Sequence, residues 1–303
     1  MGFIDLSGAL GRQFGSIGVA LNEIHTRLSI KSSNQLNILG HSVERARQCV
    51  DFFRNSLDLA ESFQLEIKTA IPEHVGLGSG TQLSLAVGTA LNAFFGLGLT
   101  VREIAALTDR GMRSGIGIGV FEQGGLVVDG GRGKNTITPP VISHLNISES
   151  WRFILVFDRR GKGLHGNQEI AAFNELPGFP KEEAARLCYL LMMQGLPAVP
   201  EQDISRFGEV ISKLQQSVGD HFAPVQGGIF ASQEVDQAMQ WLKAQGAVAI
   251  GQTSWGPTGF CAVDDKIFAE SLKHKAQQKF SQSKNLHFVV ASVRNSGGEV
   301  IVE

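Results

Sequence analysis

The amino-acid sequence predicts an α+β protein of two lobes, and three observations support this fold class. Residues 15–30 alternate apolar and polar side chains, as a pair of β-strands does. Residues 63–71 alternate in the same way and run through a glycine-rich turn into an apolar helix. An apolar strand at 151–157 then opens a second group of helices and strands. We therefore expect one lobe at residues 1–150 and another at 151–303.

Apolar residues at helical spacing place the remaining elements of the first lobe. Residues 41–59 form one predicted helix, and a second follows the glycine-rich turn with a buried stripe of Leu83, Val87, Leu91 and Phe94. A third predicted helix spans 101–110, with Thr100 as its N-cap. Residues 124–128 form a predicted strand that ends in Asp129-Gly130-Gly131.

Helices dominate the predicted second lobe. They are expected at about 181–195, 201–220 and 233–244. The predicted strands are 248–251, 259–263 and 286–293, with a helix at 264–279 between the last two.

Composition favours small-molecule chemistry. Of the 303 residues, 43% are hydrophobic and 18% are charged. A chain of this length and apolar content can bury a large core. The formal net charge of -2, without a block of like charges, argues against a nucleic-acid groove or a polybasic membrane anchor. The N-terminal residues lack a secretory signal, so we expect a cytoplasmic protein. Cys49, Cys188 and Cys261 are isolated, and we expect them to be reduced thiols in the core.

The glycine-rich turn at 72–83 is the first candidate site. Glycines allow positive φ and a close approach of backbone N–H groups to a ligand, and the helix that follows adds unpaired N–H groups and a positive dipole end. Ser79 and Gln82 have the spacing of a capping box. The segment lacks the lysine of a Walker P-loop, so backbone and hydroxyl groups must hold a phosphate there; the predicted ligands are Gly76, Gly78, Gly80, Ser79 and Thr81. A turn that only caps a core helix is the alternative.

Two basic segments supply further candidates. Arg110 and Arg113 are one helical turn apart, beside Ser114, and both can reach one oxyanion. A second loop after the strand at 151–157 carries the cationic candidates Arg159, Arg160, Lys162 and His165. The alternatives are a solvated helix end for the first segment and a surface loop for the second.

Motifs along most of the chain resemble the GHMP kinase superfamily, through the glycine turn and a later glycine-rich segment at 251–259. Four ordered motifs are more closely similar to the β-ribofuranosylaminobenzene 5'-phosphate synthases. They are Phe-Ile-Asp-Leu at 3–6 followed by Gly11-Arg12, Arg-Gly-Met-Arg-Ser-Gly-Ile-Gly at 110–117, Gly-Leu-His-Gly at 163–166 with Glu169, and Ser-Trp-Gly-Pro-Thr-Gly at 254–259. The resemblance implies a first lobe like ribosomal protein S5, a ferredoxin-like second lobe and a homodimer.

The resemblance also implies a pentosyltransferase reaction. In it, 4-aminobenzoate condenses with 5-phosphoribosyl 1-diphosphate, and diphosphate and CO2 are released. Such chemistry requires cationic and N–H groups for the phosphates, usually with Mg²⁺, and a carboxylate or dipole near the cationic anomeric carbon. Ser79 and Thr81 are the candidate Mg²⁺ ligands.

The expected roles of the other candidates follow from this reaction. His165 and Glu169 can form a pair for proton transfer or for steering the substrate carboxylate, and a satisfied surface pair is the alternative. Asp129 can bind metal or stabilise a cation, although Asp before Gly is also common in turns. Trp255 can bind the aminobenzoate ring or pack in the core. Arg12 and Thr258 belong to the motifs and are expected to contact substrate.

Two other functions stay open at this point. One is an ATP-dependent GHMP-type kinase, although residues 113–121 lack the acidic side chain that many such kinases use as a base. The other is a non-catalytic protein that binds a phosphosugar or a nucleotide.

Overall fold

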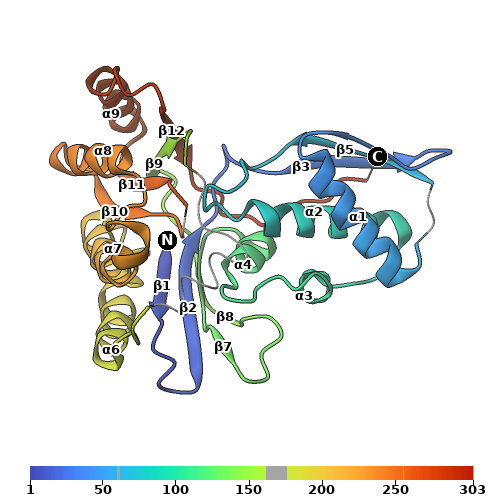
Figure 1. Cartoon of the computed structure of the whole chain (residues 1–303), viewed down its shortest axis with the longest axis horizontal. Coiled ribbons are helices and arrows are strands. Elements are labelled where there is room, and N and C mark those ends of the chain that lie inside the picture. Colours follow the sequence, from blue (N-terminus) through green and yellow to red (C-terminus); the bar gives the residue numbers. More distant parts are fainter. Residues whose placement is uncertain (60–61, 162–175, 255, 303) are drawn as a thin grey trace.

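Three β-sheets and the helices packed on them form the described part of the chain in this computed structural model (Figure 1). The structure describes residues 1–59, 62–161, 176–254 and 256–302. Two of the sheets come from the first half of the chain and one comes from the second half.

The central sheet has the order β1-β2-β6-β8, and β7 pairs with the start of β2. Its strands are β1 (Gly2–Asp5), β2 (Arg12–Val19), β6 (Leu126–Asp129), β7 (Arg132–Gly133) and β8 (Val141–Leu145). Helix α4 (Ile116–Gln123) packs on β2 and β6. The sequence predicted no helix there. Gly119 lies against Val127 and Val141 of this sheet, and Ile118 belongs to the hydrophobic cluster that contains Val87 and Leu91 of α2 (Ser79–Phe95), so the helix is buried on both sides.

A second sheet, with the order β3-β5-β4, is covered by helices (Figure 1). Its strands are β3 (Arg27–Ser32), β4 (Asn37–Gly40) and β5 (Phe63–Thr69), and the helices of this region are α1 (Val43–Leu57), α2 (Ser79–Phe95) and α3 (Val101–Leu107). Strands β4 and β5 are parallel and α1 is the crossover between them. The strands predicted at 15–30 do exist, but β2 and β3 lie in different sheets instead of pairing with each other.

The second half forms an antiparallel sheet with the order β10-β11-β9-β12. Its strands are β9 (Arg152–Asp158), β10 (Val248–Gln252), β11 (Gly259–Val263) and β12 (Leu286–Ser292). Helices α7 (Ile204–Gln226), α8 (Gln233–Ala244) and α9 (Lys266–Lys279) pack on it. This order, with helices between the first two and the last two strands, is the predicted ferredoxin-like arrangement.

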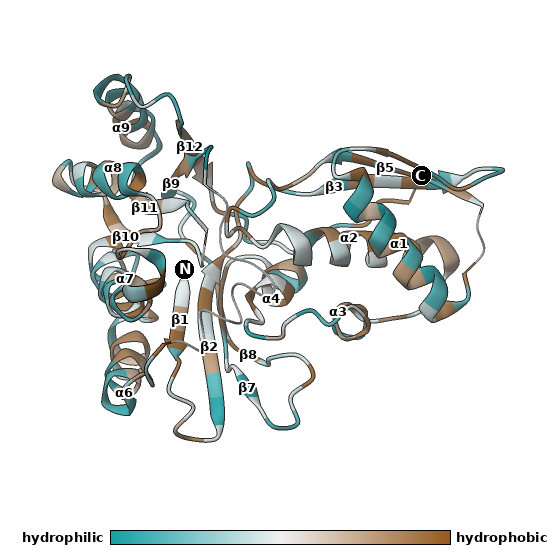
Figure 2. Cartoon of the chain, viewed as in Figure 1, coloured by the Kyte–Doolittle hydropathy of each residue, from teal (hydrophilic) through white to brown (hydrophobic). Residues whose placement is uncertain are grey.

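Helix α6 (Lys181–Leu190) is shorter than the predicted helix at 181–195, because residues Leu191–Gly195 form a π-helical turn. Cys49 and Cys261 are buried as expected, whereas Cys188 on α6 is exposed. Figure 2 shows that α1 and α6 each carry hydrophilic and hydrophobic residues. None of the described helices combines the length and the apolar character that crossing a membrane requires.

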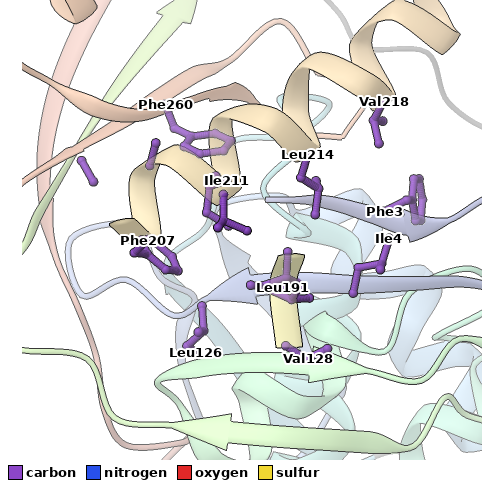
Figure 3. Close-up of a cluster of buried hydrophobic side chains, with 14 of the residues drawn as sticks. Phe3, Ile4, Leu126, Val128, Leu191, Phe207, Ile211, Leu214, Val218 and Phe260 are labelled. Carbon is purple, nitrogen blue, oxygen red and sulfur yellow. The ribbon is translucent and has the colours of Figure 1, made fainter. Parts of the chain in front are cut away.

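The largest hydrophobic cluster joins the central sheet to α7 (Figure 3). Phe207, Ile211, Leu214 and Val218 recur along α7 at helical spacing and are buried. Phe3 and Ile4 of β1 belong to the same cluster, as do Phe153 and Phe260 of the third sheet. Because the cluster crosses residue 150, the two halves of the chain share one core. The exact lobe boundary stays a prediction.

Candidate functional site

The glycine-rich turn lies against the loop before β11. The Thr253 hydroxyl donates to the carbonyl oxygen of Val75 at 2.9 Å. A side chain at Gly76, which has φ 77°, would overlap the Thr253 carbonyl, and one at Gly256 would overlap Val75. Glycine is therefore needed in both loops for a close approach of their backbones. The structure thus brings together the two glycine-rich segments that are 178 residues apart.

Helix α2 begins without a side-chain cap, because its N-cap is Gly78, which lies in the left-handed region at φ 71°. The capping box predicted for Ser79 and Gln82 is wrong: Ser79 is already the first helical residue, and no side chain caps the helix. The Gln82 amide instead donates to the Gly117 carbonyl at 2.7 Å and joins α2 to α4. Uncapped N–H groups and the helix dipole favour an anion at this end.

Two guanidinium groups converge on this first turn. Arg45 Nη2 lies 2.5 Å and Arg110 Nη1 lies 3.6 Å from the position that a Cβ would occupy at Gly80. Arg45 forms an ion pair with Glu73 at 3.7 Å, and its side chain keeps 30% of its surface exposed. Arg110 Nε is buried and has no hydrogen-bond partner among the described residues. Burial lowers the pKa of Arg110, and the nearby Arg45 charge lowers it further. A bound anion would offset the repulsion between the two guanidinium groups.

Arg45 is a site residue that no sequence motif predicted. Its side chain comes from α1, and only the fold shows that α1 packs beside the start of α2. The position of Arg45 four residues before the buried Cys49 could have indicated a side chain on the inner face of α1.

Arg110 and Arg113 do not share a helical turn, because α3 ends at Leu107 rather than at residue 110. Asp109 and Gly111 have φ values of 51° and 85°, which break the helix. Arg113 is half-buried in the connection that leads to α4. The capping box of Thr100 with Glu103 is present, so the predicted N-terminus of α3 is confirmed.

Asp129 is only 1% exposed and lies at the centre of a hydrogen-bond network. One carboxylate oxygen accepts from the Ser16 hydroxyl, from the Ser114 hydroxyl at 3.4 Å and from the Gly115 N–H at 2.9 Å. The other oxygen accepts from the Gly131 N–H at 2.8 Å. Burial raises the pKa of Asp129, although the hydrogen bonds oppose this shift. With both oxygens engaged, the arrangement favours a positioning role for Asp129 and Ser114.

The structure also describes four other predicted site residues: Arg12, Arg159, Arg160 and Thr258. Arg12 Nε donates to the Gly130 carbonyl at 2.5 Å, which places Arg12 near the turn after Asp129. Arg160 contacts Asp158 at 2.9 Å and Glu234 at 2.5 Å, so two carboxylates neutralise it. Arg159 is exposed and its Nη2 lies 3.5 Å from His287 Nδ1. Thr258 has no exposed surface, and its carbonyl accepts from the Thr253 N–H at 2.9 Å.

Four predicted site residues lie outside the described residues. They are Lys162, His165, Glu169 and Trp255. Their predicted roles in cation binding, proton transfer and ring binding remain expectations from the sequence.

The Mg²⁺ ligands predicted from the sequence are hydroxyl groups rather than carboxylates. Ser79 and Thr81 both lie in the first turn of α2, and both are half-buried. In the described part of the chain, no cluster of three or more His, Cys, Asp or Glu side chains could hold a metal ion. The residues present therefore fit Mg²⁺ only as an ion held mainly by phosphoryl oxygens of a substrate, which is a common arrangement for this ion.

Comparison with known proteins agrees with this fold and places the chain among named relatives. The family model described as GHMP kinases N terminal domain matches residues 44–121, and the model described as GHMP kinases C terminal matches residues 196–282. A mevalonate diphosphate decarboxylase structure from Staphylococcus aureus covers 95% of this chain and 89% of its own, with a TM-score of 0.66 and 16% identity. The GHMP-kinase-like fold predicted from the sequence is confirmed.

Two archaeal relatives are similar over most of their length. A beta-ribofuranosylphenol 5'-phosphate synthase from Archaeoglobus fulgidus is 33% identical, over 99% of this chain and 96% of the relative. One with the same name from Methanocaldococcus jannaschii is 33% identical, over 89% of this chain and 88% of the relative.

Proposed function

We propose a function from the premise that the chain belongs to the beta-ribofuranosylphenol 5'-phosphate synthase family of GHMP-kinase-like proteins. The proposed reaction joins the ribosyl carbon of 5-phosphoribosyl 1-diphosphate to the aromatic ring of 4-aminobenzoate. Diphosphate leaves the anomeric carbon, and the ring carbon that accepts the ribosyl group loses its carboxylate as CO2. The protein is then a pentosyltransferase.

The main support for this proposal is that Arg45 and Arg110 converge on the first turn of α2. Two guanidinium groups and the uncapped helix end can neutralise a phosphoryl group with several negative charges. As the donor loses diphosphate, negative charge grows on the leaving group, and fixed cations stabilise it without reorganisation. The site thus suits a sugar donor that carries a diphosphate.

A kinase is the second candidate, and the arrangement of α4 argues against it. A kinase base would have to accept a proton from a substrate hydroxyl near the glycine turn. Residues 113–121 contain no acidic side chain, and Glu122 at the end of α4 is bound to Arg102 at 3.1 Å. A non-catalytic phosphosugar-binding protein is the third candidate, because it needs only the anion site.

The acceptor class follows from the reaction and from the names of the relatives. Those names specify a ribofuranosylphenol product, so 4-hydroxybenzoate is an acceptor to test beside 4-aminobenzoate. In both compounds the para substituent donates electrons to the ring carbon that bears the carboxylate. That carbon is then nucleophilic toward the ribosyl cation.

We also propose Mg²⁺ as the cofactor and a homodimer as the assembly. When bound with the donor, the ion would offset the charge of the diphosphate, with Ser79 and Thr81 as its protein ligands. Titration calorimetry should show that the protein binds diphosphate more tightly with Mg²⁺ present than without it. Sedimentation equilibrium measures the assembly.

The reaction is tested with carboxyl-labelled acceptors. Purified protein is incubated with Mg²⁺, 5-phosphoribosyl 1-diphosphate and either labelled 4-aminobenzoate or labelled 4-hydroxybenzoate, and labelled CO2 and diphosphate are measured. Equal amounts of both products support the proposal, and the faster acceptor identifies the preferred ring. Hydrolysis of ATP with a small alcohol, without CO2 release, would establish the kinase instead. Donor binding without any turnover would establish the binding protein.

A further inference from the structure

A cavity of about 480 Å³ lies beside the start of β2, and none of the described residues of the glycine-rich turn line it. Arg12 and Phe14 of β2, Met112, and Arg132 and Lys134 of the segment after β6 line it. A neighbouring cavity of about 350 Å³ shares Met112, Arg132 and Lys134 and adds Arg110 and Asp109. Figure 2 shows hydrophilic residues on β7 and on the adjacent end of β2.

Neutral groups hold the two arginines of the larger cavity in place. Arg132 donates to the Met112 carbonyl at 3.1 Å and to the Thr136 carbonyl at 2.8 Å. Arg12 donates to the Gly130 carbonyl at 2.5 Å and to the Gly131 carbonyl at 3.4 Å. Within the described ranges, neither arginine nor Lys134 forms an ion pair. Three positive charges thus share one cavity without a bound carboxylate.

Arg110 connects this region to the glycine-rich turn. Its Nη1 faces the first turn of α2 beside Gly80, and the same residue lines the smaller cavity. Asp109 is the acidic residue that lines the smaller cavity, and its side chain is exposed. Arg110 therefore links the first turn of α2 to the smaller cavity, which shares Met112, Arg132 and Lys134 with the larger one.

The chemistry of the proposed reaction decides between the anions that could bind. A carboxylate that must leave as CO2 becomes neutral, and three cations around it would stabilise the reactant more than the transition state. A phosphoryl group keeps its charge throughout the reaction, so the same cations bind it without that disadvantage.

We propose that the cavity lined by Arg12, Arg132 and Lys134 binds one phosphorylated end of the sugar donor, while the first turn of α2 binds the other. This inference rests on the proposed function, because a donor with two anionic ends is what the paired regions fit. The end in the cavity is either the 5-phosphate or the diphosphate. Neither Arg132 nor Lys134 was identified from the sequence as a site residue.

The test measures ligand binding without turnover. Ribose 5-phosphate and diphosphate are titrated separately, by calorimetry with Mg²⁺ present, into the wild-type protein, Lys134→Gln and Arg45→Gln. Lys134 is exposed and makes no hydrogen bond in the described part of the chain, so its replacement should leave the fold intact, which circular dichroism checks. Lys275→Gln on the exposed side of α9 is the matched control, and Lys134→Arg keeps the charge.

We expect Lys134→Gln to weaken one of the two probes about tenfold and to leave the other within about twofold. Arg45→Gln should show the reverse selectivity, and Lys134→Arg and Lys275→Gln should bind both probes as the wild-type protein does. The probe weakened by Lys134→Gln identifies the end held in the cavity. Equal weakening of both probes, no weakening of either, or no binding to the wild type overturns the inference. If Lys134→Gln weakens the binding of one probe selectively but the wild-type protein releases no CO2, the proposed function is wrong and the second anion site is still supported.

Discussion

Asp129 accepts a hydrogen bond at 2.9 Å from the backbone N–H of Gly115, the N-cap residue of α4. The other carboxylate oxygen of Asp129 accepts a hydrogen bond from the Gly131 N–H, in the turn before Arg132. Helix α4 is joined in turn to the start of α2 by the contact between Gln82 and Gly117. One buried carboxylate therefore fixes the relative positions of both anion-binding regions.

We predict that Asp129→Asn lowers the free energy of unfolding by about 1–3 kcal/mol, because an amide offers one acceptor oxygen where the carboxylate offers two, and a backbone N–H loses its partner. Urea denaturation at pH 7 measures the change. Asp264→Asn, at an exposed carboxylate, is the control and should stay within about 0.5 kcal/mol of the wild type. Unchanged stability with lost turnover would instead favour the catalytic role that the sequence suggested for Asp129.

Ser79→Ala should change the free energy of unfolding by less than about 0.5 kcal/mol. Ser79 lies inside α2 and does not cap it, so the loss of about 1 kcal/mol that removing an N-cap causes is not expected. The variant should still bind the sugar donor more weakly, because the hydroxyl is a proposed ligand. Thermal denaturation and the KM for the donor are measured together. A large loss of stability with an unchanged KM contradicts both statements.

The sequence was sufficient to predict most elements because their signals are local. Apolar periodicity places α2 and α8, and Thr100 with Glu103 marks the start of α3. Local signals failed where contacts between residues distant in the sequence determine the structure. Ser79 has the spacing of a capping box, yet Gly78 in the left-handed region moves the start of the helix by one residue. Helix α4 was missed because Gly115, Gly117 and Gly119 disfavour a helix locally, although Ile118 is buried and the helix packs on β6.

The candidate site was predicted only in part for the same reason. Gly76 and Thr253 meet because two distant loops pack together, and both loops belong to the glycine-rich segments that carry the resemblance to the GHMP kinase superfamily. Arg45 and Lys134 belong to segments without a recognisable motif, so only the fold places them near Arg110. The sequence predicted Arg160 as a ligand residue because it lies in a basic loop, but Glu234 from α8 forms an ion pair with it.

Arg45→Gln should raise the KM for 5-phosphoribosyl 1-diphosphate about 10- to 100-fold, with little change in the KM for the aromatic acceptor. A lost charge-assisted hydrogen bond has this magnitude, and the guanidinium lies beside the first turn of α2. Arg47→Gln, two residues along the same helix at an exposed position, is the matched control. Similar KM values for both variants would exclude Arg45 from the donor site.

The ion pair of Asp158 with Arg160 predicts a pH-dependent contribution to stability. Hydrogen bonds from Arg160 lower the pKa of the buried Asp158 carboxyl to about 2, while its burial acts in the opposite direction. Because the pKa in the folded state is below the value of about 3.9 in the unfolded state, the contribution is complete above pH 4 and is lost as the pH falls toward 2. The difference in free energy of unfolding between the wild type and Asp158→Asn should therefore shrink by about 1 kcal/mol between pH 6 and pH 3. Urea titrations at the two pH values measure it, with Asp264→Asn as the reference. A difference that is the same at both pH values would show that Arg160 does not hold the carboxylate in its charged form.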